Sequence, residues 1–308
     1  MPQNIKKRCN HDKRYAALCS DDPFLRTACF NRHSVDDDGW NGQEAGDGKI
    51  GRVITMEKNQ KNINYYIEKV LCGLFLLTFI VYLVCGAFFS LKGYKMYWEA
   101  VHDKSLETRV EEIRNMEGFT TYAELPQFYI DATISVEDHR FARHFGVDPI
   151  AIGRALCTDL KARSFVEGGS TITQQLAKNL LFSAEKRVER KVAEVFAALK
   201  LESKYTKQEI FELYVNQAYY GSGYYGIYQA SMGYFGKKPS ELTDYESAIL
   251  AGVLNAPSAY APNKHPDLAK QRASQVLNSM VKHGIISQEE AERIMGGGQN
   301  VVRTESGI

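Results

Sequence analysis

Apolar residues follow two different patterns along this chain. From Val70 to Leu91 the sequence VLCGLFLLTFIVYLVCGAFFSL contains no charged residue, and its 22 residues match a helix that crosses about 30 Å of hydrocarbon. The run begins too far from the N-terminus for a cleaved signal peptide, and a buried helix of a soluble protein is the alternative. From Leu125 onward, apolar residues recur at helical spacing between short Gly and Pro breaks, which predicts a mostly α-helical domain.

These patterns divide the chain into five segments. We expect a flexible cytoplasmic tail at 1–65, where no hydrophobic period is sustained, and a transmembrane helix at 66–92. A helical juxtamembrane connector at 93–121 leads to a helical domain at 122–296, and residues 297–308 form a polar tail.

Within the domain, the breaks between apolar periods predict individual helices. Pro126 fits a helix start, and Ser287 with Glu290 has the spacing of a capping box. The polar stretch from Thr158 to Glu167 is expected to be irregular. Further helices are expected near residues 168–182, 188–199, 207–216, 243–254 and 266–283.

The stretch from Gly168 to Phe182 is unusual because Lys178 is its only charged residue. Ser170, after two glycines, is the expected N-cap. The apolar side of this helix should hold Ile172, Leu176 and Leu180. The opposite side should hold Thr171, Gln174, Gln175 and Lys178. A polar face with one cation beside a helix N-terminus suits an anionic ligand, although a surface helix that lacks acids explains the same pattern.

The next helix carries a cluster of charges. Arg187, Arg190 and Glu194 are expected to lie together on one face, and Arg190 with Glu194 also fits a surface ion pair worth about 0.3–0.5 kcal/mol. Its buried stripe is expected to consist of Val188, Val192, Val195 and Leu199.

Glu137 is a candidate for proton transfer. It follows the apolar approach Ile134-Ser135-Val136, and a carboxylate held beside apolar groups can have its pKa raised toward the useful range. The pair of Glu137 with Asp138 is a weak signal by itself, because most such pairs are solvated.

Charge and cysteine placement limit the function classes and indicate an orientation. The net charge of +1 gives no support to nucleic-acid binding by bulk electrostatics. A modest excess of Lys and Arg before the apolar run favours a cytoplasmic N-terminus. Only Cys157 follows the run, so no intrachain disulfide is expected on the outer side. The cysteines before the run do not match a compact zinc spacing and are interpreted as reduced thiols: Cys9, Cys19 and Cys29.

Four ordered blocks resemble the peptidoglycan glycosyltransferases, and together they cover roughly residues 116–295. The first is Glu137-Asp138-x-x-Phe141-x-x-His144-x-Gly146, and the second is Gly168-Gly169-Ser170-Thr171-Ile172-Thr173-Gln174-Gln175 with Lys178-Asn179. The third is Arg190-Lys191-x-x-Glu194, and the fourth runs from Glu212-x-Tyr214-x-Asn216 through Gly221 and Gly226 to Tyr234-Phe235-Gly236.

The resemblance implies a lysozyme-like, mostly α fold with a small membrane-apposed lobe. The reaction it implies is polymerisation of lipid II, a disaccharide-peptide on undecaprenyl pyrophosphate, with inversion at the anomeric carbon. Glu137 is similar in position to the general base that takes the proton from the acceptor 4-hydroxyl. Glu194 is the second implied catalytic carboxylate.

The resemblance also implies which residues bind the substrate, the basic ones by neutralising its pyrophosphate. They are Ser170, Thr171, Gln174, Gln175, Lys178, Asn179, Lys186, Arg190 and Lys191. Family members often use a divalent cation, so Mg or Mn is expected at the pyrophosphate, where Glu194 either helps to hold the ion or orients the basic cluster. Otherwise no metal-ligand set and no cofactor are assigned.

The expected location and partners follow from the same resemblance. The protein is expected in the bacterial inner membrane, with a single membrane pass, a cytoplasmic N-terminus and a catalytic domain outside the cytoplasm. The expected partners are lipid II, the growing glycan strand and other cell-wall synthesis proteins, and no nucleic acid is expected.

Two features depart from related proteins. Lys186 stands where the family commonly has arginine, so bidentate phosphate binding is lost there. A transpeptidase module needs Ser-x-x-Lys followed by Ser-x-Asn and Lys-Thr-Gly, and the latter two are missing from the sequence. A monofunctional enzyme is therefore expected.

Several alternatives stay open. One is a glycan hydrolase or lytic transglycosylase of the same fold, although such an enzyme has no use for a lysine–arginine cluster aimed at a pyrophosphate. Another is a non-catalytic, membrane-anchored scaffold, although a scaffold has no need of both Glu137 and Glu194. His144 is expected to brace the active-site loop. The tyrosine–glycine segment from Tyr219 to Tyr228 fits structural packing better than sugar stacking.

Overall fold

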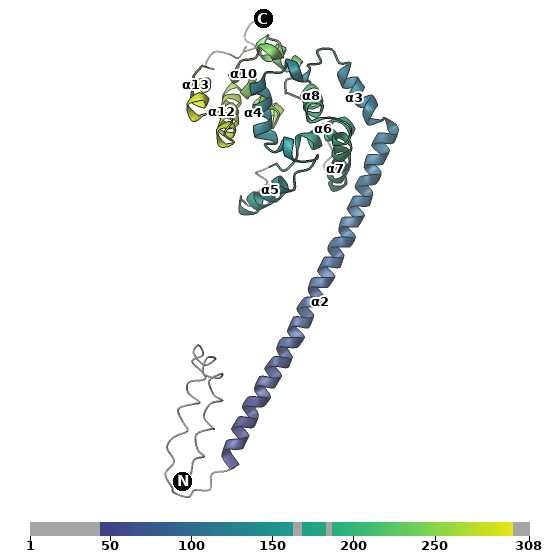
Figure 1. The fold of residues 1–308 in the computed structure, drawn as a ribbon, viewed down its shortest axis with the longest axis vertical. Helices are drawn as coiled ribbons and strands as arrows, with labels where there is room; N and C mark the ends of the chain where they lie inside the picture. Colours follow the sequence, from purple (N-terminus) through teal and green to yellow (C-terminus); the bar gives the residue numbers. More distant parts are fainter. Residues whose placement is uncertain (1–43, 163–167, 183–186, 298–308) are drawn as a thin grey trace, which may run out of the picture. The chain divides into compact units, whose positions relative to one another are not determined.

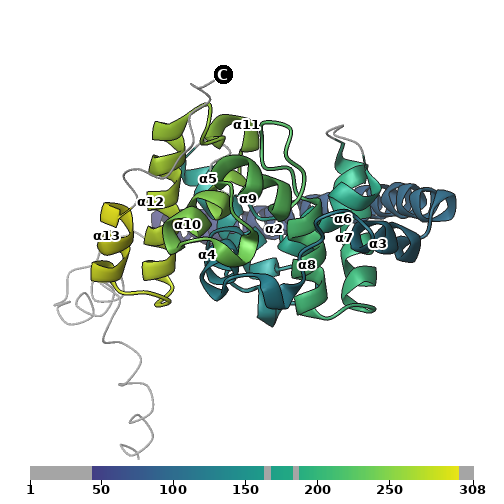
Figure 2. The same cartoon turned by 90° about the horizontal axis from the view of Figure 1, so that it is seen from above.

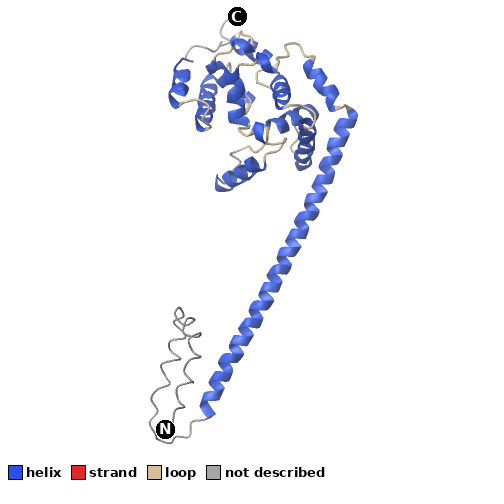
Figure 3. Cartoon of the chain, viewed as in Figure 1, coloured by secondary structure: helices blue, strands red, loops and turns tan. Residues whose placement is uncertain are grey.

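The structure of the protein is a computed structural model that describes residues 44–162, 168–182 and 187–297. Among these residues the regular elements are helical, apart from one β-bridge between Tyr219 and Tyr225. Figure 3 accordingly shows helices and loops only. The prediction of a mostly α fold is confirmed.

In chain order, the longer helices are α2 (Glu44–Asp103), α3 (Leu106–Arg114), α4 (Gln127–Glu137), α5 (Pro149–Ala162), α6 (Ile172–Leu181), α7 (Val188–Glu202), α8 (Lys207–Gln217), α9 (Ile227–Phe235), α10 (Asp244–Val253), α12 (Pro266–Lys282) and α13 (Gln288–Gly297). The short ones are η1 (Tyr122–Glu124), η2 (Phe141–Arg143), η3 (Pro239–Glu241) and α11 (Pro257–Tyr260).

The apolar run lies within α2. In the part of the chain that the structure describes, one helical segment, Thr55–Asp103, is long and apolar enough to cross a membrane, and its most apolar stretch of 18 residues has a mean hydropathy of 2.5. The helix already begins at Glu44, so the prediction of a flexible tail is wrong for residues 44–65. Neither Gly nor Pro occurs from Arg52 to Cys72, and nothing local interrupts the helix there.

The C-terminal part of α2 docks onto the domain. A Cβ at Gly93 would lie 2.6 Å from Val192 on α7, so only glycine allows this close approach. Tyr94 meets Phe196 edge to face, with ring centroids 5.3 Å apart. The predicted connector therefore begins as a continuation of α2 that packs on α7.

Arg109 on α3 fastens the same region. Its guanidinium donates to three backbone oxygens: Nε to Lys104 at 3.1 Å, Nη1 to Leu180 at 3.0 Å and Nη2 to Ala100 at 3.2 Å. Leu180 belongs to the last turn of α6, so one side chain ties α2 and α3 to the helix that carries Lys178.

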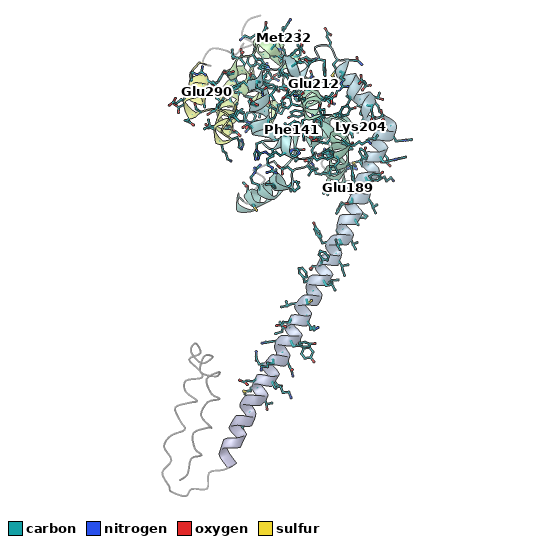
Figure 4. The ribbon with its side chains drawn as sticks, in the orientation of Figure 1. Phe141, Glu189, Lys204, Glu212, Met232 and Glu290 are labelled. Carbon is teal, nitrogen blue, oxygen red and sulfur yellow. The ribbon has the colours of Figure 1, made fainter. Side chains whose placement is uncertain are left out.

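Two groups of helices build the domain (Figure 1, Figure 2). In the first, α4, α10 and α12 pack against one another, and in the second α6 packs between α7 and α8. Phe141, 3% exposed, lies among the crowded side chains of the domain interior (Figure 4). One hydrophobic core spans both groups.

Capping by threonine marks several helix starts. The Oγ1 atoms of Thr171, Thr206 and Thr243 each accept from a backbone N–H three residues later. In return, the Gln or Glu side chain at that later position accepts from the backbone N–H of the threonine, which completes a capping box. Ser287 accepts from the Glu290 N–H at 3.1 Å, which is one of the two bonds of the predicted capping box. The prediction of Ser170 as the N-cap of α6 is wrong, because Thr171 takes that position.

Two further predictions differ from the structure. Residues 149–162 form α5, so the first part of the stretch that was expected to be irregular, Thr158 to Ala162, is helical; residues 163–167 lie outside the described part. In α7, Val188 is 59% and Leu199 38% exposed, so the predicted buried stripe is wrong. The residues that α7 buries are Ala193, Glu194, Ala197, Ala198 and Leu201.

Candidate active site

A cleft of about 610 Å³ separates the two helix groups. Its walls come from the end of α4, α5, the start and middle of α6, the end of α8, the segment after α10, and α12. Two acidic residues, Glu137 and Asp138, face this space. Four basic residues also line it: Arg154, Lys178, Arg272 and Lys282.

Glu137 is the last residue of α4 and lines the cleft, and only one of its two carboxylate oxygens has a hydrogen-bond partner in the protein. Its Oε2 accepts from Nε2 of Gln175 at 2.8 Å, and the Oε1 of Gln175 accepts in turn from the Tyr214 hydroxyl at 3.2 Å. Oε1 of Glu137 is buried and has no hydrogen-bond partner. The carboxylate is therefore fixed through one oxygen, and the other makes no hydrogen bond within the protein.

Burial raises the pKa of the Glu137 carboxyl above its usual range. The hydrogen bond from Gln175 and the charge of Arg272 oppose this, while the neighbouring Asp138 adds to it. A carboxylate with raised proton affinity and a free oxygen in a cleft has the properties of a general base.

Asp138 has a different task from its neighbour. Both its oxygens lie 2.9–3.0 Å from Nε2 of His144, and Oδ2 accepts the backbone N–H of Ile172 at 3.1 Å. It thus joins the end of α4 to the start of α6. The expectation that His144 braces the loop agrees with this contact.

The predicted contact residues around α6 divide between the cleft and the helix cap. Thr171 is 2% exposed, caps α6 and donates to the Gly146 oxygen at 2.7 Å. Gln174 is also 2% exposed, and its Oε1 accepts from the Thr171 N–H at 3.1 Å. It does not line the cleft. The predicted residues that line the cleft are Ser170, Thr171, Gln175, Lys178 and Asn179, together with Glu137.

A second charged group lies on α7, outside the cleft lining. Glu194 is 1% exposed, and its Oε2 accepts from Nζ of Lys191 at 2.7 Å. Arg190 Nε lies 3.1 Å from the other oxygen, as an ion pair. Lys191 also donates to Oγ of Ser170 at 2.7 Å, which links the group to the cleft edge. Glu194 is buried, so the interpretation as a surface ion pair is wrong; Lys186 lies outside the described residues.

The expected divalent cation does not fit this group. Both oxygens of Glu194 already face a cation, Lys191 or Arg190, and these positive charges disfavour a metal ion. Within the described ranges, no three His, Cys, Asp or Glu side chains converge as metal ligands.

The opposite wall contains residues that the sequence did not single out. Arg272 and Lys282 come from α12, and Arg154 comes from α5. The imidazoles of His139 and His283 stack with centroids 4.5 Å apart. Burial is the main cause that lowers the pKa of both imidazoles, and the nearby charge of Arg154 lowers both further.

No local signal marks these residues. Arg272 lies 135 positions after Glu137 (272 − 137) and reaches the cleft only because α12 packs on α4. Ser279 and Lys282, also on α12, both line the cleft, and Ser279 donates to the Ser135 oxygen at 2.9 Å.

Comparison with known proteins matches this chain to part of several penicillin-binding proteins. The chain is 45% identical over 174 residues to penicillin-binding protein 1A of Aquifex aeolicus, covering 56% of this chain and 24% of the relative. It is 46% identical over 173 residues to penicillin-binding protein 1F of Bacillus subtilis, covering 56% and 24%. With penicillin-binding protein 1A of Pseudomonas aeruginosa it is 36% identical over 233 residues, covering 70% and 28%.

The chain therefore spans about a quarter of the length of these relatives. The crystal structure of penicillin-binding protein 1A from Haemophilus influenzae matches with a TM-score of 0.36 and 25% identity, covering 60% of this chain and 18% of that one. The sequence model of the Transglycosylase family matches residues 104–281, which is more than half of the 308 residues. The chain belongs to the Transglycosylase family.

Proposed function

We propose that this protein is a membrane-anchored peptidoglycan glycosyltransferase that polymerises lipid II into glycan strands for the cell wall. Family membership supports the reaction class, and the single observation that carries the proposal is Glu137 in the cleft. Its fixed Oε2 and partnerless Oε1 suit a base that waits for a substrate hydroxyl.

In the proposed reaction, Glu137 Oε1 takes the proton from the 4-hydroxyl of the acceptor sugar. The 4-oxygen forms a bond to the anomeric carbon of the growing strand, and the bond from that carbon to the lipid pyrophosphate breaks. The pyrophosphate leaves with the electron pair. One displacement at carbon inverts its configuration, and base catalysis of this kind contributes about 10²–10⁴-fold.

Negative charge develops on the departing pyrophosphate, and fixed cations stabilise it. Lys178 is exposed on α6, one turn beyond the Gln175 that holds Glu137. Lys191 and Ser170 add a hydrogen-bonded pair at the edge of the same wall. Glu194 then orients Lys191 and Arg190, which is the role that its two ion pairs favour over metal binding.

We further propose that the apolar segment of α2 anchors the protein in the inner membrane, with the N-terminus in the cytoplasm and the domain outside. The mean hydropathy of 2.5 and the excess of basic residues before the run support this placement. An anchored enzyme meets a substrate whose lipid tail confines it to the same bilayer.

One assay separates the candidate functions. Full-length protein in detergent is incubated with lipid II, and the products are separated by size. Long glycan strands support the proposal, cleavage of preformed strands identifies a hydrolase or lytic enzyme, and neither product indicates a scaffold. In the same assay Glu137→Gln should make 10²–10⁴-fold less polymer.

A further inference from the structure

A pair of tyrosine rings, one half-buried and one exposed, borders the cleft after the end of α8. Tyr219 lines the cleft itself, and Tyr225 stands beside it with 58% of its surface exposed. The two ring centroids are 4.8 Å apart with an interplanar angle of 38°. One face of this pair is thus turned to solvent next to the cleft.

The backbone places both rings on the same side. Tyr219 and Tyr225 are partners in an antiparallel β-bridge, and side chains of directly opposed residues project in one direction. Two backbone bonds close the hairpin: Tyr220 N–H to the Tyr224 oxygen at 2.9 Å, and Gly226 N–H to the Ala218 oxygen at 2.8 Å.

The loop is held rigidly by positions that tolerate little change. Gly221 has φ +85°, and a Cβ there would lie 2.4 Å from the Pro257 oxygen. Ser222 is a non-glycine residue at φ +52°, and its Oγ bonds Oδ1 of Asn263 at 2.8 Å. Backbone in such sparsely populated regions persists where the surroundings enforce it, and it is often found at ligand sites.

Underneath the pair, buried contacts fix the loop, and of the two rings only Tyr219 takes part in holding it, since its hydroxyl accepts the Gly223 N–H at 3.4 Å. The Tyr220 and Tyr129 hydroxyls lie 2.7 Å apart, and the Tyr234 hydroxyl donates to the Tyr220 oxygen at 2.8 Å. The fold is therefore secured by Tyr220 and Tyr234, and Tyr225 contributes a largely solvated ring that packing does not require.

The chemistry of this surface favours an uncharged sugar ring with hydroxyl groups as its ligand. An aromatic face carries partial negative charge and attracts polarised C–H groups, such as those on one face of a pyranose. The phenol groups can exchange hydrogen bonds with sugar hydroxyls. The four basic side chains that suit an anion line the cleft itself, whereas this pair is uncharged.

We propose that Tyr219 and Tyr225 form a sugar-stacking platform for the glycan strand, next to the reacting sugars. This inference rests on the proposed function, since a glycan in the cleft would continue onto the wall that Tyr219 forms. The platform would hold a pyranose of the strand while its end reacts at Glu137.

The test measures binding of a lipid-free oligosaccharide to the full-length protein. The probe is a tetrasaccharide of alternating N-acetylglucosamine and N-acetylmuramic acid, titrated by calorimetry against protein in detergent. Tyr225→Ala should bind it about fivefold more weakly, the loss expected for one aromatic contact. Tyr225→Phe retains the ring and should keep most of the parental affinity, losing only what the hydroxyl contributes. Leu268→Ala removes another exposed apolar side chain, away from the cleft wall, and should change nothing.

A second readout is the length of the strands made from lipid II, which Tyr225→Ala should shorten. Parental binding by Tyr225→Ala, or an equal loss in Tyr225→Phe, would overturn the platform. So would unchanged oligosaccharide binding combined with weaker binding of Tyr225→Ala to phosphatidylglycerol vesicles, because the ring would then contact lipid. Tyrosine-dependent oligosaccharide binding without polymer formation would leave the platform standing and remove the proposed enzymatic function instead.

Discussion

Replacing Glu137 with Gln should remove catalysis and at the same time stabilise the folded protein at alkaline pH. Oε2 keeps a hydrogen bond from Gln175, whereas Oε1 is buried without a partner. An unsatisfied buried polar group costs about 1–3 kcal/mol, and more when it is charged. The amide of Gln preserves an oxygen for Gln175 and removes the charge, so we expect a gain of roughly 1 kcal/mol in unfolding free energy at pH 8.

The gain should depend on pH in one direction. Burial raises the pKa of Glu137 above the reference value of 4.5, so the folded state binds this proton more tightly than the unfolded state does. The resulting stabilisation is fully present below the unfolded pKa and is lost as pH rises through the folded pKa. Gln does not titrate, and therefore the advantage of Glu137→Gln should be largest at pH 8 and vanish near pH 4.

Calorimetry on the full-length protein in detergent measures this directly. For a domain of this size 1 kcal/mol corresponds to about 2–4 °C in Tm. The matched control is Glu212→Gln on α8 (Figure 4), because Glu212 Oε2 already accepts the Tyr122 N–H at 2.7 Å and the change should bring no gain. A lower Tm for Glu137→Gln at pH 8 would refute the reasoning, since the carboxylate would then be a structural ion. Near-parental polymer formation would mean that the base lies elsewhere.

Three further predictions concern other parts of the molecule. Lys178→Ala should cost at least about tenfold in turnover, or about 1.4 kcal/mol of barrier, whereas Lys200→Ala on exposed α7 surface should not; equal losses would contradict the leaving-group role. Glu194→Gln should destabilise by about 3 kcal/mol in denaturant titration, because a buried ion pair loses its charge; a loss below about 0.5 kcal/mol would match an exposed pair instead. In intact spheroplasts an impermeant maleimide should label a single-cysteine variant that keeps exposed Cys157 and spare one that keeps Cys19, and the reverse pattern would invert the proposed topology.

The spacing of apolar residues predicted the buried face of a helix correctly where that spacing alone determines which residues are buried. Ile172, Leu176 and Leu180 are all buried, as their spacing predicted. The N-cap of α6 could not be chosen in this way, because Ser170 and Thr171 are both good caps. The choice depends on distant partners: the Gly146 oxygen accepts from Thr171, and Asp138 receives the Ile172 N–H.

The buried side of α7 shows where hydrophobicity misleads. The valines looked like the core stripe, yet small Ala193, Ala197 and Ala198 are fully buried and allow the helix to approach its neighbours closely. Glu194 joins them because its ion partners lie one turn or less away. A search for periodic hydrophobic residues favours large apolar side chains. It takes no account of small residues that allow close packing, or of charged residues that are buried with a partner.

The candidate site was predictable to the extent that it is continuous in sequence. Glu137, Gln175 and Lys178 stand in blocks that resemble a family, and the structure brings them to one cleft. Arg154, Arg272 and Lys282 required the packing of α5 and α12, which no local pattern encodes. The basic wall formed by α5 and α12 therefore became visible only in three dimensions.

The Arg109 clamp has a consequence for the order in which the protein assembles during synthesis. Its partner carbonyl on Leu180 lies 71 residues further along the chain, so the apolar helix and α3 leave the ribosome before the contact can form. At typical elongation rates of about 5–20 residues per second, the guanidinium waits roughly 4–14 s for α6. During that interval Arg109 can donate only to the nearby backbone oxygens of Ala100 and Lys104. Completion of α6, and of α7 after it, then holds the end of a helix that was made first, so α2 acquires its attachment to the domain from the part of the chain that is translated later.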